Sequence, residues 1–256
     1  MEPLAQLANV AVDQIWHGFA IFLRVATVVA LLPAFGEQSV PVRIKLGVAF
    51  AFTAIVAPAV VLPEIDRTMS GIVLYSLTEI VSGLLIGIGI RLFVMALQTA
   101  GAIAAQSTSL SQLLGGASVE PLAAIGYVLM IGGMALAVIS GLHVKAAQML
   151  ILTYDILPFG LFAAGSDVAD WGTRRVSYVF GLAFTLAAPF VLVSILYNLM
   201  LGVINKAMPQ LMVAFVGAPL ITAGGLFILC ISAPVLLSVW LAALDGFLFS
   251  PFGNGQ

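Results

Sequence analysis

Charged residues are scarce in this chain. Asp, Glu, Lys and Arg make up 8% of its 256 residues, while 62% are hydrophobic. Ordinary soluble proteins carry about 25% charged residues, so this composition excludes a water-soluble globular domain. The formal net charge is only −2. Because the sequence also lacks a basic cluster that could dock phosphates, we expect no nucleic-acid partner.

Cysteine and the signatures of enzymes are also nearly absent. Cys230 is the single cysteine, so it can form no internal disulfide, and we expect it to pack as a small hydrophobic residue. His17 and His143 lie far apart and have no ligand partner at helical spacing. No G-x-S-x-G, H-E-x-x-H or Walker-type phosphate loop occurs. We therefore predict that the chain is not an enzyme and holds no metal or cofactor.

Long apolar runs dominate what is present. Only helices and closed barrels can span hydrocarbon, and no run alternates with period two, so the sequence predicts an all-α integral membrane protein. About six segments approach or exceed the roughly 20 residues that cross a bilayer: 15–34, 46–62, 71–97, 121–152, 176–204 and 207–244. The last run is longer than one crossing requires, which leaves a bent hairpin as an alternative.

The stretch "GSDVADWGTRR" at 165–175 is the only sizeable charged connection, and no linker or soluble domain is visible. We expect a single domain, 1–256. Lysine and arginine show no bias between alternate loops, which indicates that some segments do not cross the membrane in the ordinary way.

Three charged residues interrupt the apolar segments: Arg24, Glu79 and Arg91. A charge at the centre of a membrane helix costs roughly 2.5–3.5 kcal/mol, so each must face protein or water. Glu79 and Arg91 lie about 18 Å apart along one helix and cannot pair with each other. We favour structural ion pairs, between helices or between subunits, over a proton relay, for which only Glu79 and Asp155 are available.

A polar stretch without charge follows the third apolar segment, from Gln98 to Glu120. We interpret it as a long connection that suits a polar cavity or pore, with an ordinary re-entrant or surface connection as the alternative. Its candidate pore or gate residues are Gln106, Ser107, Ser109, Ser111, Gln112, Gly115 and Gly116.

The run "NKAMPQLMVAFVGAPLITAGG", residues 205–225, places two prolines and three glycines inside the most apolar third of the chain. A proline within a helix removes a backbone hydrogen bond, and lipid cannot satisfy the carbonyl that is left. We predict a helix break here that is shielded by protein, with Pro209, Gln210, Gly217 and Pro219 as its break and docking residues.

Three blocks resemble the FliR-type membrane component of flagellar and virulence type III protein export. They are "FLRVATVVALLPAFGEQSVPVRIKLGVAFAF" at 22–52, "EIVSGLLIGIGIRLFVMALQTAGAIAAQ" at 79–106, and the proline-glutamine and glycine-x-proline motifs at 209–219. Their order and spacing across the chain make the resemblance specific. Met212 and Ala218 depart from the common pattern, and 107–120 lacks the usual "MG" and "DP" dipeptides.

The resemblance implies an export-gate subunit in the bacterial inner membrane, within a flagellar basal body or a type III secretion base. It implies FliP-type, FliQ-type and FlhB-type partners, membrane lipid around the assembly, and unfolded exported proteins as substrate, with flagellum assembly favoured. The alternative from another class is a small-solute secondary transporter or channel, which would expose backbone at a paired helix break. A purely structural membrane anchor would not need the uncharged polar stretch.

Overall fold

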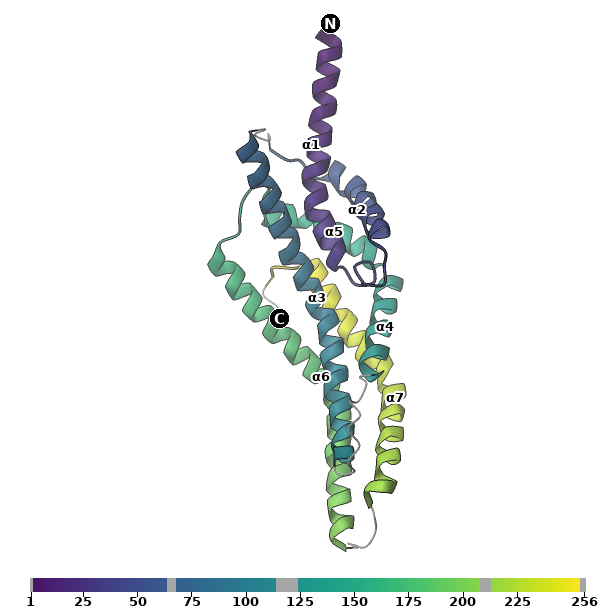
Figure 1. Ribbon diagram of the computed structural model, residues 1–256. Helices are drawn as coiled ribbons and strands as arrows, with labels where there is room; N and C mark the ends of the chain where they lie inside the picture. The colour runs from purple at the N-terminus through teal and green to yellow at the C-terminus, as the bar shows by residue number, and fades with distance from the viewer. Residues whose placement is uncertain (1, 64–67, 114–123, 208–212, 254–256) are drawn as a thin grey trace. The chain divides into compact units, whose positions relative to one another are not determined.

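The computed structural model describes residues 2–63, 68–113, 124–207 and 213–253, and every regular element in these ranges is helical. The elements are shown in Figure 1 and are α1 (Glu2–Leu31), α2 (Val42–Val56), the short 3-10 helix η1 (Ala57–Ala59), α3 (Met69–Leu113), α4 (Ala124–Ile139), α5 (Leu142–Ile156), α6 (Gly165–Ala207) and α7 (Val213–Phe249).

The chain forms two compact units. Unit 1 comprises Met1–Leu92, Val138–Arg175 and Leu244–Gln256, and unit 2 comprises Phe93–Ala137 and Val176–Ala243. The long helices α3, α6 and α7 each contribute to both units.

Unit 1 is built on the packing of α1 against α2, and α2 also contacts α5. In α1, Ile21, Val25 and Val28 are fully buried. Their spacing of four and three residues places them on one face of the helix. Ile86 and Ile90 of α3, four residues apart, are buried in the same unit. The core of unit 1 is therefore made by apolar stripes at helical spacing.

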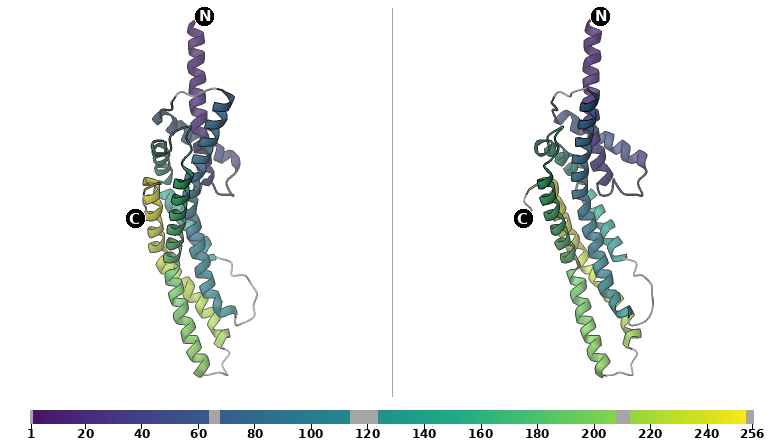
Figure 2. Two further views of the ribbon diagram at one scale, coloured as in Figure 1. Left: turned by 90° about the vertical axis from the view of Figure 1, so that its left-hand side faces the viewer. Right: turned by 60° about the vertical axis from the view of Figure 1, so that its left-hand side comes forward.

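Unit 2 contains the second part of α3, α4 and most of α6 and α7. Within it, α6 ends at Ala207, α7 begins at Val213, and the two run in opposite directions (Figures 1 and 2). The indole Nε1 of Trp240 donates to the carbonyl of Phe93 at 2.7 Å, which ties α7 to α3. A Cβ added at Gly101 would lie 2.0 Å from the Cα of Gly126, so α3 and α4 approach each other at backbone distance.

The candidate membrane spans agree with the sequence. Five helical stretches are long and apolar enough to cross a membrane, and α4 with α5 adds a sixth if this bent pair is one span. The all-α prediction with about six segments is therefore confirmed. The five stretches are Ala11–Leu31, Val42–Ala59, Met69–Ser107, Gly165–Ala207 and Leu220–Phe249.

The bend between α4 and α5 corrects one expectation. Gly141 has a φ of +84°, a left-handed conformation that glycine adopts at little steric cost. The broken segment is thus the fourth apolar run. The alternative of a bent hairpin within 207–244 is wrong for the described part of that run, because α7 is helical from Val213 to Phe249.

Two smaller expectations are also corrected. Residues 165–175 form the first turns of α6 rather than a connection, because their short polar side chains and Asp167 suit a helix N-terminus. Cys230 is exposed on α7 and not packed in the core.

Candidate functional site

A fully buried ion pair joins α1 to α3 in unit 1. Arg24 Nε donates to Glu79 Oε2 at 2.8 Å, and Nη2 donates to Oε1 at 2.9 Å. Both side chains are 0% exposed. The two parallel hydrogen bonds form the bidentate geometry that a guanidinium and a carboxylate favour. Two of the charges that stood out in the sequence are therefore partners of each other.

Helix α5 and the residue after it complete this cluster. The hydroxyl of Tyr154 donates to Glu79 Oε2 at 3.1 Å, and the ring of Tyr154 lies 3.7 Å from the Arg24 guanidinium carbon. Arg24 Nη2 also donates to the carbonyl of Leu157 at 2.9 Å. Arg24 Nη1 is buried and has no hydrogen-bond acceptor among the described residues. The pair is thus a junction of three helices, and Asp155, the other carboxylate considered for a relay, is exposed.

Two glycines allow this junction to form. A Cβ at Gly83 would lie 2.0 Å from Thr27 Oγ1 and 2.7 Å from the carbonyl oxygen of Arg24. A Cβ at Gly87 would lie 2.7 Å from Leu31 Cδ1. Glycines four residues apart on α3 therefore let α1 lie directly against its backbone, as small residues do in membrane helix packing.

The third charge, Arg91, pairs with Glu37 in the segment that joins α1 to α2. Arg91 Nη1 bonds to Glu37 Oε1, and Nη2 lies 3.4 Å from Oε2. Lys45 Nζ donates to the carbonyl of Gly36 at 2.8 Å, and the ring of Phe35 meets that of Phe52 edge to face. The block "LLPAFGEQSVP" at 31–41 thus contains a loop that α2 and α3 hold in place.

The polar stretch from Gln98 is helical over most of its length. Residues 98–113 belong to α3, so the expected connection does not begin at Gln98. Gln106 is exposed and Ser107 is buried. Ser194 of α6 donates from its hydroxyl to the carbonyl of Ser107. The backbones of Ser109, Ser111 and Gln112 are helical, and Gly115 and Gly116 lie outside the described residues.

The expected helix break at the start of α7 is only partly described. Pro209 and Gln210 lie outside the described residues. Gly217 and Pro219 belong to the helical backbone of α7, which begins at Val213. The described helix therefore continues through Pro219.

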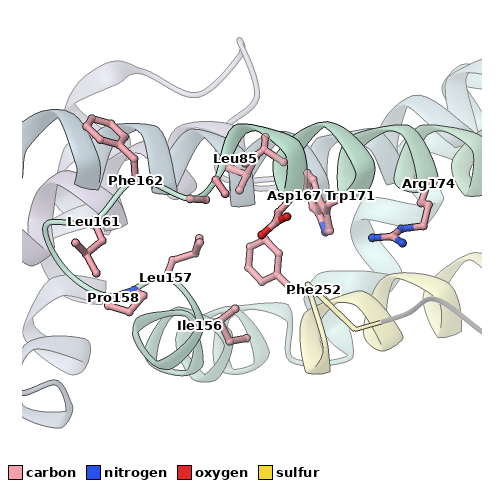
Figure 3. Close-up of a pocket in the computed structure, with 13 residues that line it drawn as sticks. Leu85, Ile156, Leu157, Pro158, Leu161, Phe162, Asp167, Trp171, Arg174 and Phe252 are labelled. Carbon is pink, nitrogen blue, oxygen red and sulfur yellow. The ribbon is translucent and has the colours of Figure 1, made fainter.

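A cavity that the sequence did not predict opens beside the start of α6 (Figure 3). Its volume is about 370 Å³. The end of α5, the segment 157–164 and the first turns of α6 line it, together with Leu85 and Phe252. Asp167, Trp171 and Arg174 project from α6 toward it (Figure 3). Tryptophan beside charges of both signs in "GSDVADWGTRR" was the available sequence signal.

A third ion pair was also missed by the sequence argument. Lys145 Nζ of α5 donates to Asp245 Oδ1 and Oδ2 of α7 at 2.7 and 2.8 Å. Lys145 lies within the fourth apolar segment, 121–152, and Asp245 directly follows the sixth, 207–244, so neither was among the charges considered for pairing. Across the ranges that the structure describes, no three His, Cys, Asp or Glu side chains gather to hold a metal ion.

Comparison with known proteins gives the family. A family profile described as "Bacterial export proteins, family 1" matches residues 15–247. The chain is 31% identical over 231 residues to the flagellar biosynthetic protein FliR of Caulobacter vibrioides, which covers 89% of this chain and 92% of that protein.

Two further relatives carry the same name. FliR of Escherichia coli is 26% identical over 216 residues, 84% of this chain and 83% of that protein. FliR of Bacillus subtilis is 24% identical over 231 residues, 86% of each chain. The resemblance drawn from the three sequence blocks is confirmed. The chain is thus a membrane component of protein export and not an enzyme, and it belongs to the bacterial export proteins, family 1, with the FliR proteins.

Proposed function

We propose that this chain is a subunit of the flagellar export gate, which passes unfolded protein substrates across the bacterial inner membrane. The observation that carries the proposal is the similarity to a flagellar FliR protein over 89% of the chain. The family match from residue 15 to 247 runs through both compact units, which supports treating 1–256 as one functional domain.

The partners that we propose are FliP-type, FliQ-type and FlhB-type subunits. Arg24, Glu79 and Arg91 all find partners within the chain, so these charges do not require a neighbour. Large apolar side chains on the surface do require a neighbour. Phe180, Phe184 and Leu199 of α6 are each more than 60% exposed. Such a surface needs lipid or other subunits to cover it. We assign the docking of neighbours to the region of Pro209, Gln210, Gly217 and Pro219.

Residues 106–118 are the proposed gate. A passage wide enough for an unfolded chain has to be closed at rest by something that binds no particular sequence. Uncharged Ser, Thr and Gln side chains offer no fixed charge to a passing substrate, and Gly115 with Gly116 gives a backbone of low steric cost. The hydrogen bond from the Ser194 hydroxyl to the Ser107 carbonyl attaches the start of this segment to α6, which supports a gate that is anchored at one end.

The function is tested by deleting the gene in the bacterium that encodes it. We expect loss of motility and of secreted hook and filament proteins, with recovery when the intact gene is returned. Normal flagella would overturn the proposal. Normal flagella together with a defect in the uptake of a small solute would favour the transporter alternative.

The gate is tested by removing about half of 106–118. The complex should still assemble, and its ion conductance at rest should rise. A shortened chain that assembles, stays tight to ions and exports normally would contradict the gate.

The docking role is tested with the double variant Pro209→Ala and Pro219→Ala. Co-purification of the FliP-type and FliQ-type subunits should fall. Pro234→Ala is the matched control, because Pro234 is an exposed proline farther along the same helix. Equal recovery of the partner subunits with the native chain, the double variant and the Pro234→Ala control would contradict the docking role.

A further inference from the structure

We propose that the cavity beside the start of α6 binds one phospholipid with a zwitterionic, amine-bearing headgroup of the phosphatidylethanolamine type. One of its two acyl chains would occupy the apolar cavity, and its headgroup would lie between Asp167 and Arg174. This inference goes beyond protein export and does not depend on which substrates the chain passes.

The cavity wall suits an acyl chain. Ile156, Leu157, Pro158 and Leu85 line it with apolar groups. Leu161 and Phe162 belong to the same wall, and each is more than half exposed. The volume of about 370 Å³ lies near the lower end of the roughly 300–1,000 Å³ found for small-molecule pockets. A narrow apolar ligand therefore fits the cavity better than a whole helix would.

The charges at the cavity indicate the headgroup. Asp167 and Arg174 are seven residues apart on α6, which is two helical turns or about 10 Å on one face. Figure 3 shows both on the cavity side of the helix. Ser166 donates to Asp167 Oδ1 at 3.3 Å. Among the described residues, no ion pair joins either charge to a partner. An ammonium at Asp167 and a phosphate at Arg174 would satisfy both.

The place of the cavity in the fold supports a lipid. It lies where α5 ends at Ile156 and α6 begins at Gly165, at the ends of two apolar helices. Trp171 projects toward it, and its Nε1 donates to the carbonyl of Pro251 at 2.8 Å. Tryptophan and charged side chains gather at the headgroup level of membrane proteins. A partner helix would be recognised by an apolar stripe along a groove, and two unpaired charges of opposite sign favour the lipid instead.

The first experiment measures lipid retention. The full chain, in mild detergent with whatever subunits co-purify, is incubated with phosphatidylethanolamine, phosphatidylcholine or phosphatidylglycerol and analysed by native mass spectrometry. We expect one molecule of phosphatidylethanolamine to be retained in preference to the others. Phosphatidylcholine cannot donate hydrogen bonds to Asp167, and phosphatidylglycerol has no cation. Equal retention of phosphatidylglycerol would overturn the zwitterionic assignment.

Variants locate the retained lipid. Asp167→Asn and Arg174→Gln should each lower retention of phosphatidylethanolamine by roughly two- to fivefold, as expected for exposed ionic contacts. Asp170→Asn and Arg43→Gln are matched controls, because both residues are exposed and neither lines the cavity. Equal loss in the controls would overturn the site.

A second measurement uses the unaltered chain. Phosphatidylethanolamine with a photoreactive group in its acyl chain should label the peptide that spans residues 156–174. Labelling only of peptides outside this range would overturn the proposal.

Discussion

The two arginine–glutamate pairs of unit 1 use the same chemistry in different surroundings. Arg24 and Glu79 are 0% exposed. Arg91 and Glu37 retain 29% and 17% of their side-chain surface. A fully buried charge has lost its water and depends on its partner, whereas a partly exposed charge can recover solvent when its partner is removed. Burial, more than the hydrogen bonds themselves, should therefore decide how much each pair matters to folding.

The largest effect is expected for Glu79→Ala. This change leaves Arg24 buried without a counter-charge, which typically costs about 3–5 kcal/mol of unfolding free energy. Unfolding of the purified chain in mild detergent, titrated with sodium dodecyl sulfate, measures the loss. The double variant Arg24→Met with Glu79→Leu should recover most of it, because an apolar pair needs no partner. A single variant as stable as the native chain would show that burial does not make the pair essential.

A smaller effect is expected for Gly83→Ala, which tests shape rather than charge at the same junction. The new methyl group would meet Thr27 Oγ1 and the backbone of Arg24, and overpacking of this kind costs about 1–3 kcal/mol. The same unfolding titration applies. Gly47→Ala is the matched control, since nothing lies within 4 Å of its added Cβ. Equal stability of the two variants would mean that α1 does not lie against α3 as closely as described.

For Glu37→Gln we expect a loss of only about 1 kcal/mol or less, because Arg91 can regain water. The loss should shrink further at high salt, which screens the exposed pair and leaves Arg24 with Glu79 little changed. A loss as large as that of Glu79→Ala would contradict the contrast between the two pairs.

The smallest effect is expected for Lys145→Met. The pair of Lys145 with Asp245 is partly exposed, and an ammonium on a flexible stem gains about 0.5 kcal/mol from such a contact. The thermal unfolding midpoint should shift by no more than a few degrees. A loss of stability as large as that of Glu79→Ala would show that burial does not rank these pairs.

Much of the fold could be predicted from the sequence because the segments of a membrane protein that lie in lipid or protein are long and nearly free of charge. Uncharged runs marked the spans, and Arg24 and Glu79 stood out because charges are rare in such runs. Their pairing could not be predicted, since 55 residues separate them. Their pairing depends on the close contact of α1 with α3 at Gly83, and the sequence of either helix alone does not show that contact.

Helix ends were harder to predict than helices. The bend at Gly141 lies in an apolar run whose proline, Pro121, stands at the very start, and one glycine among four gives little signal until its φ is known. The polar residues after Gln98 were taken as a connection, yet α3 continues to Leu113. Serine and glutamine are tolerated within helices, and neither glycine nor proline occurs between Ala102 and Leu114 to end this one. The cavity at α6 arises from three segments meeting and has no counterpart in any single stretch of sequence.

The length of α6 has a consequence for the environment of the chain. Val176 and Val203 are 40% and 64% exposed on this one helix, and 27 residues of helix separate them by about 40 Å. The hydrocarbon layer of a bilayer is only about 30 Å thick. An upright helix cannot keep both side chains in that layer, so at least one end of this apolar surface reaches the headgroup region or beyond it, where acyl chains no longer cover it.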